Sequence, residues 1–391
     1  MSPALMAGAI SEAVGALCIA SALAGCIYTV AATLVVRRFA ARDREPTPRA
    51  PGITILKPLA GAAPGLYEDL RTFCDQEYLG PVQIVFSARD STDPAVAIAR
   101  RLIAERPGRD LELVLHEPTM GANPKIANLV ALEGRIRHEI VVLADADIGV
   151  APDYLRRTVA ALGEANVGAV TLLYHGVARG GIWARLASMG IDYHFVPSVL
   201  VALALGLARP CFGSTIALRR ETLESIGGFA AFGDRLADDY AIGQAVRAHG
   251  MNVVIPSYFV AHGCSERSAN ELLRHELRWA RTTRAVNPLG FAGSVVTHPV
   301  PLALIGAALT GFNEYGIAAI LAALGCRLVL QVQVDHTLRV RGDRWWLGVA
   351  RDLIAFGVHV ASHFVSIVSW RGRRYRVRTD GTLVAIGEPK A

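Results

Sequence analysis

The chain has 391 residues, enough for one large domain or two ordinary ones, and its 52% hydrophobic content and mean hydropathy of +0.35 predict membrane segments. The formal charge of +6 suits a protein lying against anionic lipid headgroups, and no basic stretch interleaved with aromatic residues supports nucleic acid as a partner. None of the six cysteines forms a CxxC pair, so neither a disulfide framework nor a thiolate zinc site is indicated.

An uncharged apolar run at residues 13–36 is long enough to span a bilayer. It is too long for the core of a signal peptide, and basic residues follow it rather than precede it. We therefore predict a retained anchor, which together with its Pro/Arg-rich linker occupies residues 1–45. The positive-inside rule places the side that follows the anchor in the cytoplasm. The basic residues there are Arg37, Arg38, Arg42, Arg44 and Arg49.

Residues 46–285 alternate between two kinds of segment and predict a cytoplasmic α/β domain with a mostly parallel sheet. Strand-like apolar runs occupy 52–57, 82–88, 111–116 and 139–144. Helix-like segments occupy about 64–74, 94–105, 124–135 and 152–163. Within this domain, the apolar stretch 181–208 is interrupted by Pro197 and carries charges in its first half, so we expect a helix that dips into the membrane surface rather than spans it. Such a helix could place a hydrophobic acceptor entrance beside the chemistry.

Residues 286–391 return to membrane-like composition. The apolar runs 296–312 and 315–334 predict a membrane hairpin, which brings the chain back to the cytoplasm at the basic loop 335–344. If 345–370 also spanned, the strongly basic tail at 371–378 would lie outside.

Segment 345–370 also carries ionisable residues that are costly at mid-bilayer, namely Arg351, Asp352, His359 and His363. We therefore expect it to lie in the interface or to re-enter the membrane. His359 and His363 have the spacing of metal ligands on a helix, but with no third ligand nearby in sequence a plain helix face is the favoured interpretation.

Two carboxylates one residue apart, Asp145 and Asp147, directly follow the strand-like run at 139–144. Because like charges repel, such a pair invites a cation or a ligand. The pair is equally compatible with a solvated turn, since Asp is a common N-cap. Asp90 similarly ends a strand and would share a rim with Asp145, because ligands of open parallel sheets bind beyond the carboxyl ends of the strands. Asp90 could also be an ordinary turn aspartate.

Three further sequence motifs contain charged or polar residues that could act in a site. Lys125 lies at a predicted helix N-terminus, where it could meet a phosphate or be solvated. Asp238 and Asp239 open an amphipathic helix, as caps or as a carboxylate base directed at an acceptor hydroxyl. In the stretch "HELRWARTTR", arginines recur every third residue from Arg278, one turn after His275. That cationic face suits an anionic leaving group, lipid phosphates or plain solvent.

The order Asp90, Asp145, Asp239, then Arg278-Trp279 resembles the D…D…D…(Q/R)xxRW pattern of membrane-bound family 2-like glycosyltransferases. The ceramide glucosyltransferase group (family 21) and bacterial relatives, including hopanoid-biosynthesis glycosyltransferases, are the most similar. The motifs that carry the resemblance are "ILKPLAG", "RDSTDPA", "GSTIALRRETLESIGGF", "LADDY" and "HELRWARTTR". It implies a GT-A catalytic domain, Rossmann-like with a mostly parallel sheet, between N-terminal and C-terminal transmembrane helices.

The resemblance also implies roles in donor binding. Asp90 would hold the uracil ring, and Lys125 would lie near the diphosphate. Asp145 would be the second aspartate of the pattern, and with Asp147 it would form a DxD that binds Mg²⁺ or Mn²⁺ bridging the phosphates of UDP.

For catalysis, Asp239 would be the general base, and Arg278 and Trp279 would be the signature pair near the diphosphate and acceptor. The chain departs from the pattern at His275, where the family has Gln or Arg. A neutral His donates fewer hydrogen bonds and its charge depends on pH, which puts the role of that position in doubt.

These residues fit an inverting, metal-assisted transfer of glucose or N-acetylglucosamine from a UDP-sugar to a lipid hydroxyl of ceramide, hopanoid or diacylglycerol type. The enzyme would be a multi-pass protein of the cell (inner) membrane with its catalytic domain on the cytoplasmic face, and no obligate protein partner is inferred. A processive polysaccharide synthase would need more spans for secretion. A transporter or lipid-binding membrane protein would need polar residues inside the spans, and would leave the ordered aspartates unexplained.

Overall fold

The computed structural model describes residues 2–41, 50–116, 123–340, 345–365, 367–370, 373–377 and 383–386. It divides into two compact units, each built from separate stretches of the chain. The sheet unit contains 43–185, 210–267 and 369–391, and the helical unit contains 1–42, 186–209 and 268–368. Most of the predicted linker at 42–51 and part of the basic loop and tail lie outside the described residues.

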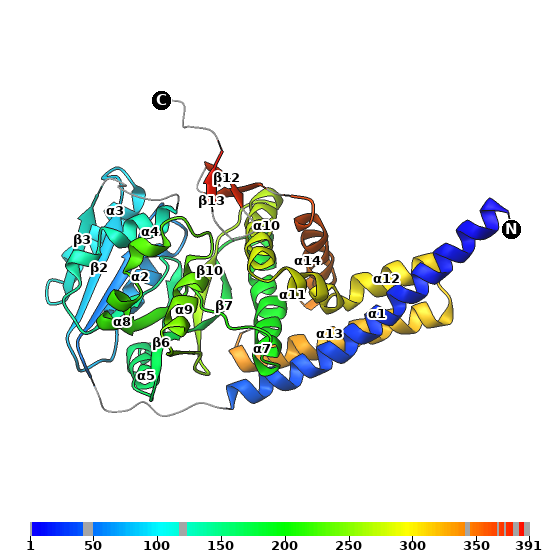
Figure 1. The fold of residues 1–391 in the computed structure, drawn as a ribbon, viewed down its shortest axis with the longest axis horizontal. Coiled ribbons are helices and arrows are strands. Elements are labelled where there is room, and N and C mark those ends of the chain that lie inside the picture. The colour runs from blue at the N-terminus through cyan, green and yellow to red at the C-terminus, as the bar shows by residue number, and fades with distance from the viewer. Residues whose placement is uncertain are drawn as a thin grey trace. The chain divides into compact units, whose positions relative to one another are not determined.

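The sheet unit is built on a seven-stranded sheet in the order β3-β2-β1-β4-β8-β6-β9. Figure 1 labels β3, β2 and β6 of this sheet. Strand β8 pairs antiparallel with both neighbours, whereas the remaining pairs are parallel, so the predicted mostly parallel sheet is confirmed. The strands are β1 (Ile53–Pro58), β2 (Val82–Ala88), β3 (Asp110–Leu115), β4 (Ile140–Leu143), β6 (Val167–Thr171), β8 (Ile216–Arg219) and β9 (Asn252–Val254).

Helices cover both faces of this sheet because alternate strand residues point to opposite sides. On β1, Ile53 and Ile55 join the core formed with α2 (Leu66–Cys74), α3 (Pro94–Glu105) and α5 (Tyr154–Leu162). Leu56 joins the opposite core. That second core includes α4 (Pro124–Val130), α8 (Arg220–Ser225), η3 (Phe229–Phe232) and α9 (Asp238–Ala248). The predicted α/β class is therefore confirmed.

Helix α4 is shorter than the predicted segment 124–135. After Val130 the chain turns into the short 3-10 helix η1 (Glu133–Arg135). The carboxylate of Glu133 accepts a hydrogen bond from the backbone N–H of Phe229. The local sequence pattern that predicted a helix over 124–135 does not indicate this long-range contact.

A second, three-stranded sheet in the order β5-β10-β7 lies in the same unit. Strand β5 (Ile148–Gly149) directly follows the two predicted carboxylates and pairs antiparallel with β10 (Phe259–Cys264), which pairs parallel with β7 (Leu173–Ala178). This sheet therefore brings a distant segment beside the predicted rim. A third sheet consists of β11 (Ile367–Trp370), β12 (Arg373–Val377) and β13 (Leu383–Ala385).

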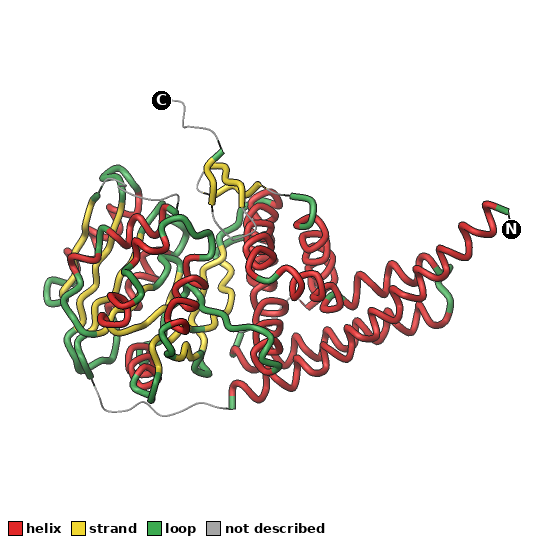
Figure 2. Tube along the Cα trace, viewed as in Figure 1, coloured by secondary structure: helices red, strands yellow, loops and turns green. Residues whose placement is uncertain are grey.

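In the helical unit, the long helices α1 (Pro3–Ala40) and α13 (Glu314–Leu338) pack side by side with the shorter α12 (Pro299–Leu309), as Figure 2 shows. Glycines allow close backbone approach: a Cβ at Gly306 would lie 3.0 Å from the carbonyl oxygen of Gly15, and one at Gly25 would lie 2.4 Å from that of Val296. Small residues at helix crossings are typical of membrane bundles.

Three helical segments of the described chain are long and apolar enough to cross a membrane: 6–40, 182–204 and 314–338. Many large apolar side chains on α1 and α13 are exposed in the chain by itself, as in a lipid-facing surface. The predicted N-terminal and C-terminal apolar helices are therefore confirmed as candidate spans. The structure does not test on which side of a membrane their ends lie.

The run 296–312, which we predicted as the first arm of a membrane hairpin, is not one straight helix. The chain forms α11 (Pro288–Gly293) and the short helix η4 (Ser294–Thr297), then bends by 66° into α12. At the break, Pro299 disfavours helical geometry at His298, which has φ −112° and ψ 62°. With eleven residues, α12 reaches only about 16 Å, too short to cross alone.

Within the stretch 181–208, residues 182–204 form a continuous helix, and Pro197 does not interrupt it as expected. It consists of α6 (Ile182–Gly190), a π-helical turn (Ile191–Phe195) and α7 (Val196–Ala204). Pro197 lies at the start of α7, directly after the π turn, where the wider hydrogen-bond spacing accommodates a residue without an N–H. The helix is long enough to span, so its expected location at the membrane surface stays a prediction.

The two charged side chains at the start of α14 (Gly348–Ser362), Arg351 and Asp352, form ion pairs inside the helical unit, which makes them less costly in a membrane. The basic tail remains a reason to expect that 345–370 does not span. Asp352 forms an ion pair with Arg327 of α13, with N–O distances of 2.6 and 2.9 Å, and its Oδ1 lies 2.9 Å from His194 Nε2. Arg351 pairs with Glu276 of α10 (Ala269–Val286). With fifteen residues, α14 still reaches only about 22 Å, short of a bilayer core.

The rings of His359 and His363 lie 5.3 Å apart, with Phe291 stacked on His359. Within the described residues, no group of three or more His, Cys, Asp or Glu side chains is arranged to hold a metal, and the helix-face interpretation of this histidine pair stays a prediction.

Candidate active site

Strands β1 and β4 run parallel, so their carboxyl ends meet at one edge of the sheet. Asp145 is the second residue after the end of β4. Its backbone carbonyl accepts a 2.7 Å hydrogen bond from the side chain of Lys57 on β1. Lys57 is fully buried against the ring of Phe73, with Nζ 3.6 Å from the ring centroid. Burial lowers the pKa of Lys57 to about 7, although the carboxylates of Asp147, Asp145 and Asp69 oppose that shift.

Lys125 lies in the first turn of α4, where the side chain of Asn123 caps the helix by accepting from the backbone N–H of Lys125 and Ile126. The Lys125 ammonium lies 2.7 Å from Oδ1 of Asp145 and 3.4 Å from Oδ2 of Asp238. Burial opposes the charge on Lys125, but these carboxylates outweigh burial and raise its pKa above the ordinary range. The structure therefore brings Lys125 and Asp145 together and excludes a solvated lysine.

Asp238 and Asp239 occupy the first turn of α9, and neither caps that helix, whose N-cap is Ala237. The buried Asp238 accepts from Asn123 Nδ2 at 3.2 Å and pairs with Lys125. Asp239 accepts from two backbone N–H groups, those of Gly213 at 2.9 Å and Tyr240 at 2.8 Å. Burial, followed by the charge of Asp238, raises the pKa of Asp239 to about 6.

Gly213 connects the two aspartates that the sequence places far apart. Its N–H donates to Asp239, and its carbonyl accepts from the backbone N–H of Asp145 at 3.2 Å. A Cβ at this position would lie 2.7 Å from Lys125 Nζ and 2.9 Å from Asp145 Oδ2. The backbone therefore approaches the ion pair as closely as only glycine permits.

Asp147 is the better candidate for a metal ligand. One of its oxygens, Oδ2, lies 3.6 Å from Nδ1 of His262 on β10, and the other, Oδ1, is buried without a hydrogen-bond partner among the described residues. The backbone carbonyl of Asp147 accepts from Gly263 at 2.8 Å, which fixes the pair across the two segments. A carboxylate and an imidazole leave most of a divalent cation's coordination to ligand oxygens, whereas Asp145 is already paired with Lys125.

Beside Asp147 lies a buried ion pair between Asp69 of α2 and Arg179. Burial raises the pKa of Asp69 to about 6, although Arg179 and Lys57 favour its charged form. The carboxylate also lies against β5, because a Cβ at Gly149 would come within 2.9 Å of Asp69 Oδ1. The pair holds the start of β5 next to the rim.

Asp90 is exposed at the end of β2 and accepts from the backbone N–H of Thr92 at 2.8 Å, which lowers the pKa of its carboxyl. Asp93 caps α3 and also accepts from the backbone N–H of Gly61, at 2.9 Å. These contacts fix the two loops after β1 and β2. Among the described residues, Asp90 forms no hydrogen bond or ion pair with Lys125 or Asp145, and its expected role in holding a base stays a prediction.

His275, Arg278 and Trp279 lie on α10 in the helical unit, and the His275 and Trp279 rings are 4.3 Å apart, edge to face. The arginines that continue this face, Arg281 and Arg284, donate to the backbone carbonyl of Ser362 at the end of α14. They therefore satisfy a helix C-terminus, which explains part of the cationic face without a ligand.

Sequence reasoning did not single out Lys57, Gly213 or His262 as site residues. Lys57 could have been found from the sequence, because it is a lysine inside an otherwise apolar predicted strand. His262 had no local signal, because only the pairing of β10 with β5 brings it to Asp147.

A mostly parallel sheet covered on both faces, with carboxylates and a lysine gathered beyond its strand ends, is a GT-A-like fold. The same fold occurs in mannosyltransferase PcManGT from Pyrobaculum calidifontis, solved in complex with GDP-Man and Mn²⁺, with a TM-score of 0.50 and 22% identity over 89% of this chain and 99% of that chain.

The model of glycosyl transferase family 21 matches residues 17–383, and the chain belongs to that family. Ceramide glucosyltransferase 1 of Caenorhabditis elegans is 24% identical over 380 residues, which are 93% of this chain and 81% of the relative. The ceramide glucosyltransferase of Gibberella zeae is 30% identical over 177 residues, 40% of this chain and 34% of the relative.

Proposed function

We propose that this chain is an inverting hexosyltransferase that moves glucose or N-acetylglucosamine from a UDP-sugar to the hydroxyl of a ceramide- or hopanoid-type lipid. The observation that carries the proposal is the joint placement of Asp239 and Asp145 through Gly213, beside the ammonium of Lys125. The similarity to ceramide glucosyltransferases supports a lipid acceptor. The candidate spans support a location in the cell membrane, with the sheet unit on its cytoplasmic face.

For donor binding, we assign the diphosphate to the edge where Lys125 and the N-terminus of α4 supply positive charge. Lys125 would exchange part of its pairing with Asp145 and Asp238 for phosphate oxygens. Asp90 would hold the uracil ring, and Arg278 and Trp279 would act near the leaving group and acceptor, with His275 one turn earlier on the same helix.

Asp147 and His262 would hold a divalent cation, with Asp145 beside them on the diphosphate side. An imidazole nitrogen among the ligands favours Mn²⁺ over Mg²⁺, which prefers an all-oxygen octahedron. When bound, the cation supplies Lewis-acid stabilisation of the charge on the departing UDP.

Asp239 would take the proton of the acceptor hydroxyl. Its pKa of about 6 keeps it ionised at pH 7 and makes it a stronger base than an exposed aspartate. Attack from the side opposite the leaving group inverts the anomeric centre, so an α-linked UDP-sugar would give a β-glycoside.

The test uses the full chain purified in detergent. UDP release from UDP-glucose or UDP-N-acetylglucosamine should require both a lipid acceptor and Mn²⁺ or Mg²⁺. Asp239→Asn should lower turnover about 10²–10⁴-fold while donor binding stays nearly intact. Asp110→Asn, at an exposed ion pair on β3, is the matched control. Release that is independent of metal would reject the cation assignment, and loss of donor binding in Asp239→Asn would assign that residue a structural role.

A further inference from the structure

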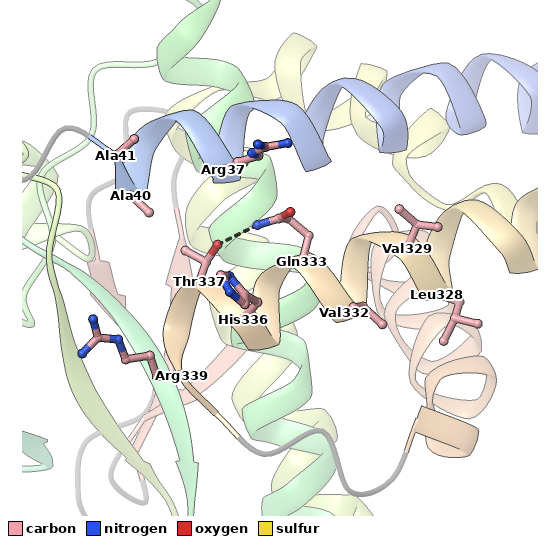
Figure 3. Close-up of a pocket in the computed structure, with 10 residues that line it drawn as sticks. All are labelled: Arg37, Ala40, Ala41, Leu328, Val329, Val332, Gln333, His336, Thr337 and Arg339. Atoms are coloured by element: carbon pink, nitrogen blue, oxygen red, sulfur yellow. Dashed lines mark hydrogen bonds between the residues drawn. The ribbon is translucent and has the colours of Figure 1, made fainter.

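A pocket of about 860 Å³ lies between the C-terminal ends of α1 and α13, within the helical unit (Figure 3). One part of its lining is polar and basic, with Arg37 from α1 and Gln333, His336, Thr337 and Arg339 from α13. The other part is apolar. It is formed by Leu328, Val329 and Val332, one to three turns earlier on α13, with Ala40 and Ala41 of α1.

The basic part of the pocket is available to an anion. Arg37, His336 and Arg339 are exposed, and no described carboxylate forms an ion pair with any of them. Gln333 and Thr337 bond to each other at 3.1 Å, which orders the wall between the charged groups.

Arg339 adopts a left-handed backbone conformation with φ 55° and ψ 36°, and its N–H closes the end of α13 on the carbonyl of Asp335. Glycine is the usual residue at such a helix end, and a side chain there costs about 1 kcal/mol. Arg339 therefore destabilises the end of α13 locally, and it places a charged side chain beside the pocket.

The apolar part of the pocket belongs to the candidate span. Leu328, Val329 and Val332 are 46%, 58% and 61% exposed although they lie in a helix apolar enough to cross a membrane. The lining of the pocket therefore changes from apolar to cationic within about two turns toward the C-terminus of α13. That distance is comparable to the thickness of a bilayer interface.

We propose that this pocket binds an anionic phospholipid, with its charged headgroup in the polar and basic part of the lining, which includes Arg37 and Arg339, and the first part of an acyl chain along Leu328, Val329 and Val332. The inference rests on the membrane location proposed above. Basic pockets at the ends of membrane helices recognise lipid phosphates through charge and hydrogen bonds. A free phosphate would leave the apolar wall unused, and a neutral acceptor lipid would leave the two arginines unpaired.

The test measures lipid binding rather than sugar transfer. The full chain in mild detergent is incubated with phosphatidylglycerol or with phosphatidylcholine, and native mass spectrometry counts the bound lipid. We expect at least tenfold preference for phosphatidylglycerol and a loss of about tenfold in Arg37→Gln/Arg339→Gln. Arg38→Gln removes an equal charge from the neighbouring residue of α1, which does not line the pocket, and should bind normally. Normal binding in the double variant would overturn the proposal.

Arg339→Gly separates loss of the site from loss of folding. It suits the left-handed backbone and should raise the melting temperature, while phosphatidylglycerol binding falls. Binding that rises along with stability would contradict the proposal. Inorganic phosphate at millimolar concentration should not displace the lipid, and displacement would identify a phosphate site instead.

Because the assay contains neither donor nor acceptor, its outcome is independent of the proposed transfer reaction. A chain that transfers sugar but shows no preference between the two lipids overturns the lipid inference alone. A chain that prefers phosphatidylglycerol but releases no UDP overturns the proposed function alone.

Discussion

At the residue scale, the candidate site is organised around two lysine side chains that lie among carboxylates. Lys125 stays charged because Asp145, Asp238 and Asp239 surround it, whereas burial brings the pKa of Lys57 close to neutrality. The carboxylates in turn are held by backbone N–H groups and by Asn123. These charged groups are held in place before a donor binds, and preorganised charge of this kind lowers a reaction barrier, although Lys125 would exchange part of its pairing for phosphate oxygens.

The raised pKa of Asp239 predicts the pH dependence of turnover. A general base acts only when ionised, so log kcat should fall with a slope of about one below pH 6 and reach a plateau above it. Steady-state kinetics from pH 5 to 8 would measure this profile, with melting temperatures recorded at each pH to exclude acid unfolding. A flat profile down to pH 5 in a folded enzyme would contradict Asp239 as the base.

Gly213→Ala should lower activity more than stability. The added methyl would meet the tips of two side chains, Lys125 and Asp145, rather than backbone, so those tips can move at little cost to folding. Their displacement by a few tenths of an ångström to one ångström should reduce kcat/KM about 10–100-fold, with a change in unfolding free energy below about 1 kcal/mol. Gly108→Ala, where a Cβ meets nothing within 4 Å, is the control. Equal effects of the two variants on activity would refute this account of Gly213.

The sequence allowed part of this site to be predicted. The shared edge of parallel strand ends predicted that Asp145 lies on one rim with Asp90, and the family resemblance added Lys125 and Asp239. The structure joins Asp145 to Lys125 and, through Gly213, to Asp239. The partnership of Asp147 with His262 could not, since it depends on β10 adding to β5 from a remote part of the chain. Our proposed preference for Asp147 over Asp145 as metal ligand also required the structure, because the salt bridge to Lys125 distinguishes the two carboxylates.

At the element scale, apolar runs predicted which segments are helical but not how they end or pair. The break at His298 follows from the prolines beyond it, whose local restriction the overall hydropathy of 296–312 conceals. The charges of α14 looked costly in isolation, and their neutralisation by Arg327, His194 and Glu276 depends on contacts between helices that no periodicity encodes.

The crossing of α1 and α12 should depend on Gly306. A larger side chain there would meet the backbone of Gly15 and Ile19, which cannot move without separating the helices. Gly306→Leu should therefore destabilise the chain by about 1–3 kcal/mol, seen as a lower melting temperature in detergent. Gly325→Leu on α13, where a Cβ meets nothing within 4 Å, should have little effect. Equal melting temperatures for these two variants would show that close approach at Gly306 is unimportant.

At the scale of the whole molecule, each unit is assembled from discontinuous stretches of chain. Residues 186–209 and everything from 268 to 368 join the helical unit, although the alternating pattern suggested a single domain through 285. A segment's affinity for one unit or the other is decided by long-range packing, so composition along the chain indicates candidate spans but not which of them associate.

The bundle itself predicts the topology of the spans. The C-terminal ends of α1 and α13 line one pocket, so these helices run in the same direction, and both ends carry arginines. By the positive-inside rule, Ala41 and Val340 should then be cytoplasmic and the turn at Phe312, between α12 and α13, should lie on the opposite side.

Single cysteine variants measure this arrangement directly. In intact cells, a membrane-impermeant maleimide should label Phe312→Cys, whereas Ala41→Cys and Val340→Cys should react only after permeabilisation. The six native cysteines are buried or half-buried, so the parent chain gives the background. Phe312 already adopts φ 55° and is 57% exposed, so its replacement adds no new backbone strain and leaves an accessible thiol. Labelling of all three positions from the same side would mean that α13 does not cross the membrane, and the polar and apolar parts of the pocket between α1 and α13 would then both face water.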